Sequence, residues 1–300
     1  MWKKIILAIL FVTLSTGWIF IYFASGVISV ISWWGMQLFS LFSLIILSIS
    51  GSIIVRNVFC KRKVHKTIIS IFILAIIGAW PVCWFGGIGQ IAYPVDTHST
   101  NPKVTVRFPL SQTAIVGWGG NEIETNYHAI APNQRWAYDL LMMPAGMKHS
   151  NLEDYGIYGA DVLAPASGTV VSIQNDEFDL KLGADDSNSM VGNHIYIRLD
   201  ETGTYLVLAH LKKGSVRVKK GQHIKEGTVV ANVGNSGNSS EPHLHIHHQR
   251  QDPSKTSIFL TEGLPLYFRG IQGPAAPKGG VRIERGKDVP VGDIITPLPL

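Results

Sequence analysis

Residues 194–210 read HIYIRLDETGTYLVLAH. They contain two short runs rich in β-branched and aromatic residues, His194–Leu199 and Tyr205–Leu208, separated by turn formers such as Asp200 and Gly203. Runs of this length between turn signals are typical of β-strands. This stretch therefore predicts β structure, and the same pattern recurs elsewhere in the chain.

Five further runs have the same character and are likewise separated by clusters of Gly, Asn, Asp and Ser: Ala114–Val116, Asp161–Leu163, Thr169–Ile173, Val229–Val233 and His243–His247. After Val95 the sequence has no amphipathic pattern long enough for a helix of about a dozen residues. We therefore predict a mainly β, antiparallel domain in this part of the chain.

The N-terminal part has a different composition, because it is apolar and almost uncharged. The run Ile5–Val55 contains no charged residue. At about 1.5 Å per residue it exceeds one crossing of a ~30 Å hydrocarbon core, so it fits two helices joined near Gly26. A second uncharged run, Thr67–Val95, fits one more span at Thr67–Gln90. We predict three transmembrane helices within residues 1–95.

The charges are divided unevenly between the two parts. The formal net charge is +5, but residues 1–95 contain seven of the 26 Lys and Arg and none of the 21 Asp and Glu. The remaining residues therefore carry 19 basic and 21 acidic side chains, a net charge of −2. A nearly neutral domain has no basic surface for nucleic acid, so a nucleic-acid partner is excluded.

Positive charges also predict the orientation in the membrane. Lys3 and Lys4 precede the first span, and a basic cluster at 56–66 lies between the second and third spans. Positively charged loops prefer the cytoplasm, so we expect a cytoplasmic N-terminus and an exterior C-terminal domain. A cleaved signal peptide ending near Phe23-Ala24-Ser25 is the rival interpretation, and the apolar run that continues beyond it argues against cleavage.

The strongest chemical signal is the segment 242–248, PHLHIHH. On a strand, alternate side chains share a face, so His243, His245 and His247 point the same way. The helical zinc motif of metalloproteases requires Glu after the first His, and Leu244 stands there instead. The pattern therefore favours a strand that presents imidazoles to one site.

A solvated strand would also accommodate four histidines in six residues. This alternative weakens because Asp139 and His210 each lie beside an apolar run and supply further polar groups for a site. Zinc accepts His nitrogen and Asp oxygen, and catalytic zinc keeps three protein ligands and one open position.

Several segments resemble, in the same order along the chain, the lysostaphin or LytM-type zinc endopeptidases. They are Ala164–Val171, Gly192–Ile197, Ala209–Leu211, Val218–Gly221, Ile224–Gly227, Val233–Gly237 and His243–His245. The resemblance covers roughly residues 110–270, and the combination is specific although each segment alone is a weak signal.

The resemblance implies a compact antiparallel β fold with a groove across one sheet. It also implies a Zn²⁺ cofactor held by His128, Asp139 and His245, with His210 and His243 as the catalytic histidines. Members of this family cut peptide bonds in peptidoglycan, so peptidoglycan peptides are the expected partner of the domain.

The first ligand departs from the usual spacing. In most members the first His lies four residues before the Asp, whereas His128 lies eleven residues before Asp139 and Arg135 occupies the usual place. Arginine has no lone pair to offer a metal, so we interpret residues 129–136 as an insertion. His149 is the reserve candidate.

We expect the other histidines to be structural or solvent-facing rather than ligands: His65, His98, His194, His223, His247 and His248.

The sequence predicts four parts. Residues 1–95 form a membrane anchor in the lipid bilayer, 96–110 a linker, 111–270 the LytM-type metallopeptidase domain and 271–300 a C-terminal extension. Within the extension, Val281–Glu284 alternates and predicts an edge strand. Both cysteines lie in the first part, so the rest has no disulfide.

The resulting hypothesis is a zinc-dependent endopeptidase anchored in the bacterial cytoplasmic membrane, with its catalytic domain on the outer side. One alternative is a non-enzymatic module that binds cell wall or activates another hydrolase. A second alternative, a biotinyl or lipoyl carrier formed by Ala164–Ile173 and Gly221–Val233, lacks the lysine that such a carrier presents on a hairpin. The oligomeric state stays undetermined.

Overall fold

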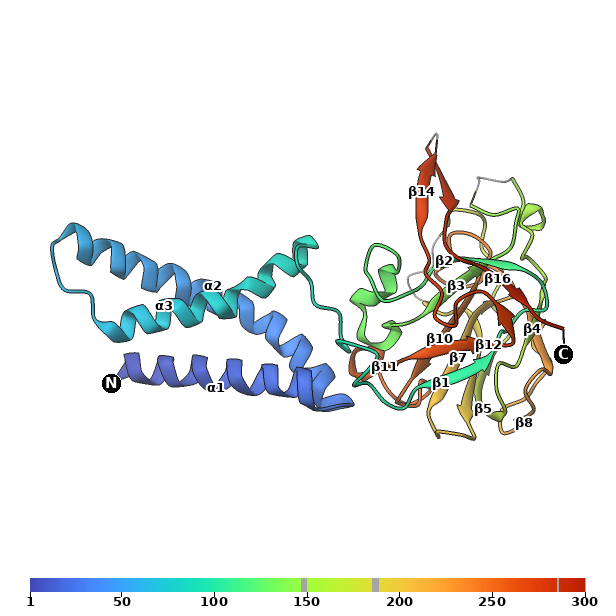
Figure 1. The fold of residues 1–300 in the computed structure, drawn as a ribbon, viewed down its shortest axis with the longest axis horizontal. Coiled ribbons are helices and arrows are strands. Elements are labelled where there is room, and N and C mark those ends of the chain that lie inside the picture. The colour runs from blue at the N-terminus through green and yellow to red at the C-terminus, as the bar shows by residue number, and fades with distance from the viewer. Residues whose placement is uncertain (147–149, 185–188, 285, 300) are drawn as a thin grey trace. The chain divides into compact units, whose positions relative to one another are not determined.

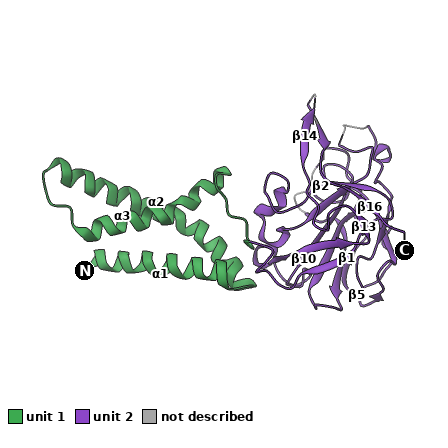
Figure 2. Ribbon diagram, viewed as in Figure 1, with its two compact units in different colours: residues 1–95 green, residues 96–300 purple. Residues whose placement is uncertain are grey.

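The structure is a computed structural model that describes residues 1–146, 150–184, 189–284 and 286–299. The chain divides into two compact units, residues 1–95 and 96–300 (Figure 2). His149, the reserve ligand candidate, lies outside the described residues.

The first unit is helical (Figure 1). Among the described residues, three helices are long and apolar enough to cross a membrane, which confirms the predicted number of apolar helices. They are α1 (Trp2–Phe23), α2 (Val27–Phe59) and α3 (Lys66–Ala79), the last continuing into the 3₁₀ turn η1 (Trp80–Gly86).

In these helices large apolar residues occupy the outer surface, and small polar residues occupy buried positions. Large apolar side chains such as Phe11, Leu38 and Phe42 face outward and are more than half exposed. Ser40 and Ser43 are instead fully buried between helices. Apolar exteriors with small polar residues at helix contacts are typical of helices in lipid.

The turn between α1 and α2 lies at the predicted position. Gly26 has φ 75°, a backbone conformation that costs glycine little and other residues more. It lets the chain reverse between two apolar helices within three residues, 24–26.

The second unit is built on a large antiparallel sheet (Figure 1), which confirms the predicted fold class. Within the described residues the strands follow this order across the sheet: β13 (Ile271–Gln272), β16 (Ile294–Pro297), β2 (Ala114–Trp118), β3 (Tyr138–Leu141), β10 (Leu244–Gln249), β7 (Tyr205–Leu211), β6 (Asn193–Leu199), β5 (Gly168–Gln174) and β8 (His223–Ile224), with β11 (Gly263–Leu264) also paired to β10.

Three smaller two-stranded pairs complete the unit. They are β1 (Val104–Arg107) with β12 (Leu266–Arg269), β4 (Asp161–Leu163) with β9 (Val229–Asn232), and β14 (Val281–Glu284) with β15 (Lys287–Pro290). The first pair is parallel and the other two are antiparallel.

The seven predicted β runs all coincide with strands, whereas two segments outside them differ from expectation. The range 96–110, expected to be a linker, contains β1, and Val104, Val106 and Phe108 are buried in the main core. The reason is their alternation with polar residues, the pattern of a half-buried strand. The C-terminal extension contributes β13 and β16 to the large sheet, while 281–284 pairs with β15 away from the sheet edge.

Candidate metal centre

Two histidines and one aspartate meet on the large sheet. Ligand atoms of His128, Asp139 and His245 all lie within 4.8 Å of one another. His128 Nε2 is 2.9 Å from Asp139 Oδ2, and His245 Nδ1 is 2.8 Å from Asp139 Oδ1. All three side chains are buried. The structure therefore brings together the three residues that the sequence predicts as ligands.

The strand register places two of them directly opposite each other. His245 on β10 pairs with Asp139 on β3, so the two Cα atoms are neighbours across the ladder. Side chains alternate along a strand, and the flanking Leu244 and Ile246 are fully buried in the hydrophobic core. Core packing on one face thus fixes the orientation of His245 on the other face.

His128 reaches the site through two short 3₁₀ turns, η2 (Tyr127–Ile130) and η3 (Pro132–Gln134). Asn126 fixes the loop that contains η2 and η3 to the start of β3, because its side-chain amide donates to the carbonyl of Ala137 at 3.3 Å. The same side chain accepts from the backbone N–H of His128 at 3.2 Å. The eleven-residue separation between His128 and Asp139 is therefore spanned by a loop that folds back.

Arg135 lies outside the metal cluster. Its guanidinium donates to Asn121 Oδ1 at 2.9 Å and lies 4.9 Å from the ring of Trp136. Burial lowers the pKa of Arg135 to about 10, so the side chain remains a cation at neutral pH. A cation in this place anchors the loop and does not ligate a metal.

His210 occupies the end of β7 beside the cluster. Its backbone has φ 59°, which is uncommon for a residue other than glycine and concentrates at functional sites. The ring centroid lies 4.6 Å from that of His243. The Nδ1 atom is 2.8 Å from the carbonyl oxygen of Ser236, which can only accept. Nδ1 therefore carries the proton and Nε2 keeps its lone pair.

His243 is held in the same tautomer. Its Nδ1 donates to the carbonyl oxygen of Glu241 at 2.8 Å, which leaves Nε2 as the lone-pair nitrogen. That Nε2 lies 3.7 Å from Asp139 Oδ1. Two imidazoles beside the cluster thus each present a basic nitrogen whose orientation a backbone carbonyl fixes.

Electrostatics favour an ionised Asp139 beside neutral His210 and His245. Burial lowers the pKa of His210 well below its usual range, and the nearby His243 and His245 lower it further. Burial also lowers the pKa of His245. For Asp139, burial acts to raise the pKa, but the neighbouring imidazoles, His128 and His243 foremost, bring it well below the ordinary value. An ionised carboxylate with imidazole nitrogens is a donor set that fits Zn²⁺.

Tyr127 is a site residue that the sequence analysis missed. Its hydroxyl donates to Asp139 Oδ2 at 3.3 Å, and its ring packs edge-on against Trp118 with centroids 5.1 Å apart. Burial raises the pKa of Tyr127, and the Asp139 charge raises it further, so the hydroxyl stays protonated. Its position directly before His128 was the available signal.

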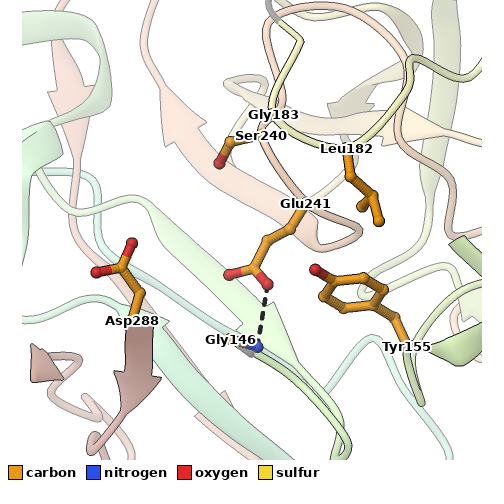
Figure 3. A pocket seen from close by; sticks show the side chains of 7 residues that line it. All are labelled: Gly146, Tyr155, Leu182, Gly183, Ser240, Glu241 and Asp288. Atoms are coloured by element: carbon orange, nitrogen blue, oxygen red, sulfur yellow. Dashed lines mark hydrogen bonds between the residues drawn. The ribbon is translucent and has the colours of Figure 1, made fainter. Parts of the chain in front are cut away.

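Two adjoining pockets open beside these residues. One, of about 220 Å³, is lined by Asp139, His243, Tyr127 and Trp118. The other, of about 390 Å³, is shown in Figure 3. Ser240 and Glu241 line both, and the Glu241 carboxylate accepts from the backbone N–H of Gly146 at 3.0 Å. The two pockets thus meet at Ser240 and Glu241 beside the metal cluster, and we refer to the pair as the groove.

The remaining predicted structural histidines lie away from the cluster, with one exception. His194 stacks on Tyr196, His223 pairs with Asp200 at the surface, and the side chain of His65 caps α3. His248 lies on the opposite face of β10. His247 is the exception, since its Nδ1 lies 2.8 Å from Nε2 of His245.

The sequence model described as Peptidase family M23 matches residues 149–256. That segment carries His210, His243 and His245 within its bounds, and it identifies the second unit as containing an M23 peptidase domain. The predicted resemblance to lysostaphin-like peptidases is thereby confirmed. His128 and Asp139 precede the matched segment, and only the tertiary structure brings them to it.

Solved structures with a similar chain path include peptidases and a chain of a pore forming complex. The catalytic domain of the antimicrobial peptidase lysostaphin from Staphylococcus simulans is 21% identical, with 49% of this chain and 84% of that chain covered and a TM-score of 0.30. A zinc containing peptidase from Vibrio cholerae is 19% identical, with 49% and 37% covered and a TM-score of 0.33. A chain of the SpoIIQ–SpoIIIAH pore forming complex is 17% identical, with 54% and 89% covered and a TM-score of 0.34. At these identities and TM-scores the similarities carry no inference about activity.

Proposed function

We propose that this protein is a membrane-anchored, zinc-dependent endopeptidase that hydrolyses peptide bonds of bacterial peptidoglycan. The observation that carries the proposal is the buried cluster of His128, Asp139 and His245 with two further histidines beside it in an open groove. Membership of the second unit in an M23 peptidase family supports a metallopeptidase type of chemistry.

His128, Asp139 and His245 are the proposed ligands. Three protein ligands leave one position of a tetrahedral zinc open for water. When bound, Zn²⁺ supplies a water of lowered pKa and a Lewis acid for the scissile carbonyl. The adjacent groove offers a way for a peptide to reach this position.

His210 and His243 are the proposed catalytic residues. Each keeps its Nε2 free as a proton acceptor, because its Nδ1–H donates a hydrogen bond to a backbone carbonyl. One Nε2 can accept a proton from the attacking water, and the imidazolium so formed can donate it to the leaving amine. The carbonyls of Ser236 and Glu241 stabilise the positive charge that develops on either ring.

The groove suits an extended peptide. Its two pockets share Ser240 and Glu241, so a chain lying across the cluster would continue into the larger pocket. Glu241 and Asp288 face this larger pocket (Figure 3) and give it an acidic wall.

The proposed location is the bacterial cytoplasmic membrane, with the second unit outside. Three apolar helices form the anchor. Lys3, Lys4 and the basic segment that follows α2 would lie in the cytoplasm by the positive-inside rule. An odd number of spans then exports the second unit to the side where peptidoglycan lies.

The test is cleavage by the full chain purified in detergent. We expect about one zinc per chain and release of peptides from peptidoglycan, both abolished by a chelator and by His245→Ala. His223→Ala is the matched control, because His223 is an exposed histidine paired with Asp200. Binding of peptidoglycan without cleavage at full zinc occupancy would refute the enzyme and favour a non-enzymatic module.

A further inference from the structure

A row of buried polar side chains continues from the metal cluster along β10. His245, His247 and Gln249 occupy alternate positions of this strand, and each is only 3% exposed. His245 Nε2 lies 2.8 Å from His247 Nδ1, and His247 Nε2 lies 2.9 Å from Gln249 Oε1. The row ends where Gln249 Nε2 donates to the backbone carbonyl of Gln251 at 2.7 Å.

The direction of every hydrogen bond in the row follows from its far end. The carbonyl of Gln251 can only accept, so the Gln249 amide nitrogen must face it and the Gln249 oxygen must face His247. A reversed amide would place two oxygens 2.7 Å apart.

The amide oxygen of Gln249 likewise only accepts, so His247 carries its proton on Nε2. A neutral His247 then accepts on Nδ1, and His245 must donate to it from Nε2. The remaining nitrogen of His245, Nδ1, is left with its lone pair directed at the cluster.

We propose that His247 and Gln249 are positioning residues that hold His245 in the tautomer that can ligate a metal through Nδ1. The inference rests on the proposed function only in taking His245 as a ligand. It assigns a role to His247, which the sequence alone placed among the structural histidines.

The consequence lies in the contact between His245 and Asp139. With the row in place, Nδ1 and the carboxylate oxygen 2.8 Å away are both acceptors, an arrangement that a cation relieves. If the row is broken, His245 is free to move its proton to Nδ1 and donate to Asp139. Both ligand atoms are then occupied by one internal hydrogen bond that a metal has to displace.

A purely structural role for the row predicts something different. In that case removal of His247 lowers stability through a buried donor left unpaired on His245, and the affinity for metal stays unchanged. Substitutions at His247 separate the two roles, because glutamine preserves the donor and acceptor pattern and leucine removes it.

The experiment measures zinc affinity of the full chain in detergent by competition with a chelating dye. Outer hydrogen-bond partners of metal ligands are worth about 10- to 100-fold in affinity, so we expect His247→Leu to weaken zinc binding by that factor. We expect His247→Gln to remain close to wild type. His248→Gln is the matched control, because His248 is a buried histidine of the same strand that bonds Thr204 and Pro265 instead.

A second readout does not need the variants to fold. In metal-free wild-type chain labelled with ¹⁵N-histidine, we expect NMR to find His245 and His247 both protonated on Nε2. A proton on His245 Nδ1 there, or unchanged zinc affinity in folded His247→Leu, overturns the proposal. Neither readout uses peptidoglycan, so absence of cleavage alone would refute the proposed activity and leave this assignment standing.

Discussion

Acidification should destabilise the second unit through His248, a buried histidine on the core-facing side of β10. Its Nδ1 donates to the carbonyl of Pro265 at 3.1 Å, and its Nε2 lies 2.6 Å from the hydroxyl of Thr204. Burial, opposed in part by the Pro265 hydrogen bond and reinforced by the charge of Arg250, lowers its pKa from 6.5 to about 4. The folded protein therefore holds His248 in its neutral form at neutral pH.

The sign of the effect follows from this depressed pKa. Above pH 6.5 the ring is neutral in both the folded and the unfolded chain, and its contribution does not change. As the pH falls toward 4, the unfolded chain binds a proton at this site and the folded chain does not, so the free energy of unfolding decreases. A difference of about 2.5 pKa units corresponds to about 3 kcal/mol, which is lost between pH 6.5 and pH 4.

The assay compares denaturant unfolding of residues 96–300 with that of His248→Gln at pH 7, 6, 5 and 4, with chelator present throughout. Glutamine does not titrate, so the difference in unfolding free energy between the two proteins isolates His248 from the other histidines. We expect the wild type to be more stable at pH 7 and its advantage to shrink by about 3 kcal/mol at pH 4. A difference that stays constant with pH would refute the reasoning.

Three further predictions address the site and the anchor. Asp139→Asn should remove bound zinc and peptidoglycan cleavage while the chain stays folded, measured by metal analysis and circular dichroism; zinc retained at full occupancy would contradict the ligand assignment. Gly237→Ala should lower the free energy of unfolding by about 1–3 kcal/mol, because φ at Gly237 is 75° and a Cβ there would lie 2.3 Å from the backbone nitrogen of Gly192. It should also reduce cleavage, since the preceding Ser236 carbonyl orients His210. Unchanged thermal unfolding would show that the loop can adapt. In intact cells a membrane-impermeant thiol reagent should label Ser99→Cys in a Cys83→Ser background and leave Cys60 unlabelled. Cys60 precedes α3, whereas residue 99 is exposed and follows η1, so the third span separates the two positions. Labelling of Cys60 alone would reverse the orientation.

The helices and most strands were predictable because their signals are local. Apolar runs without charge define α1 to α3, and the alternation at 194–199 and 205–208 defines β6 and β7. Such patterns depend only on neighbouring residues. Strand β1 was missed because polar turn formers precede it and its partner β12 lies about 160 residues away.

The candidate site was predictable in part. Histidine alternation at 243–247 indicates one shared face, and the resemblance to a peptidase family pointed to Asp139 and His128. The identity of the residue beside His245, however, depends on the pairing of β10 with β3 across 106 residues of chain. A loop tied by Asn126 then decides whether His128 reaches the cluster.

By itself, therefore, the sequence determined the division of the chain into an apolar helical part and a β part, and the types of residue available for a metal site. Tertiary structure alone decided which of these residues meet, and it gave His247 a hydrogen bond to His245. The physical reason is that periodicity is a property of a single strand. A ligand set instead depends on the register between strands, and the direction of the hydrogen bonds along β10 depends on the acceptor at the end of the row.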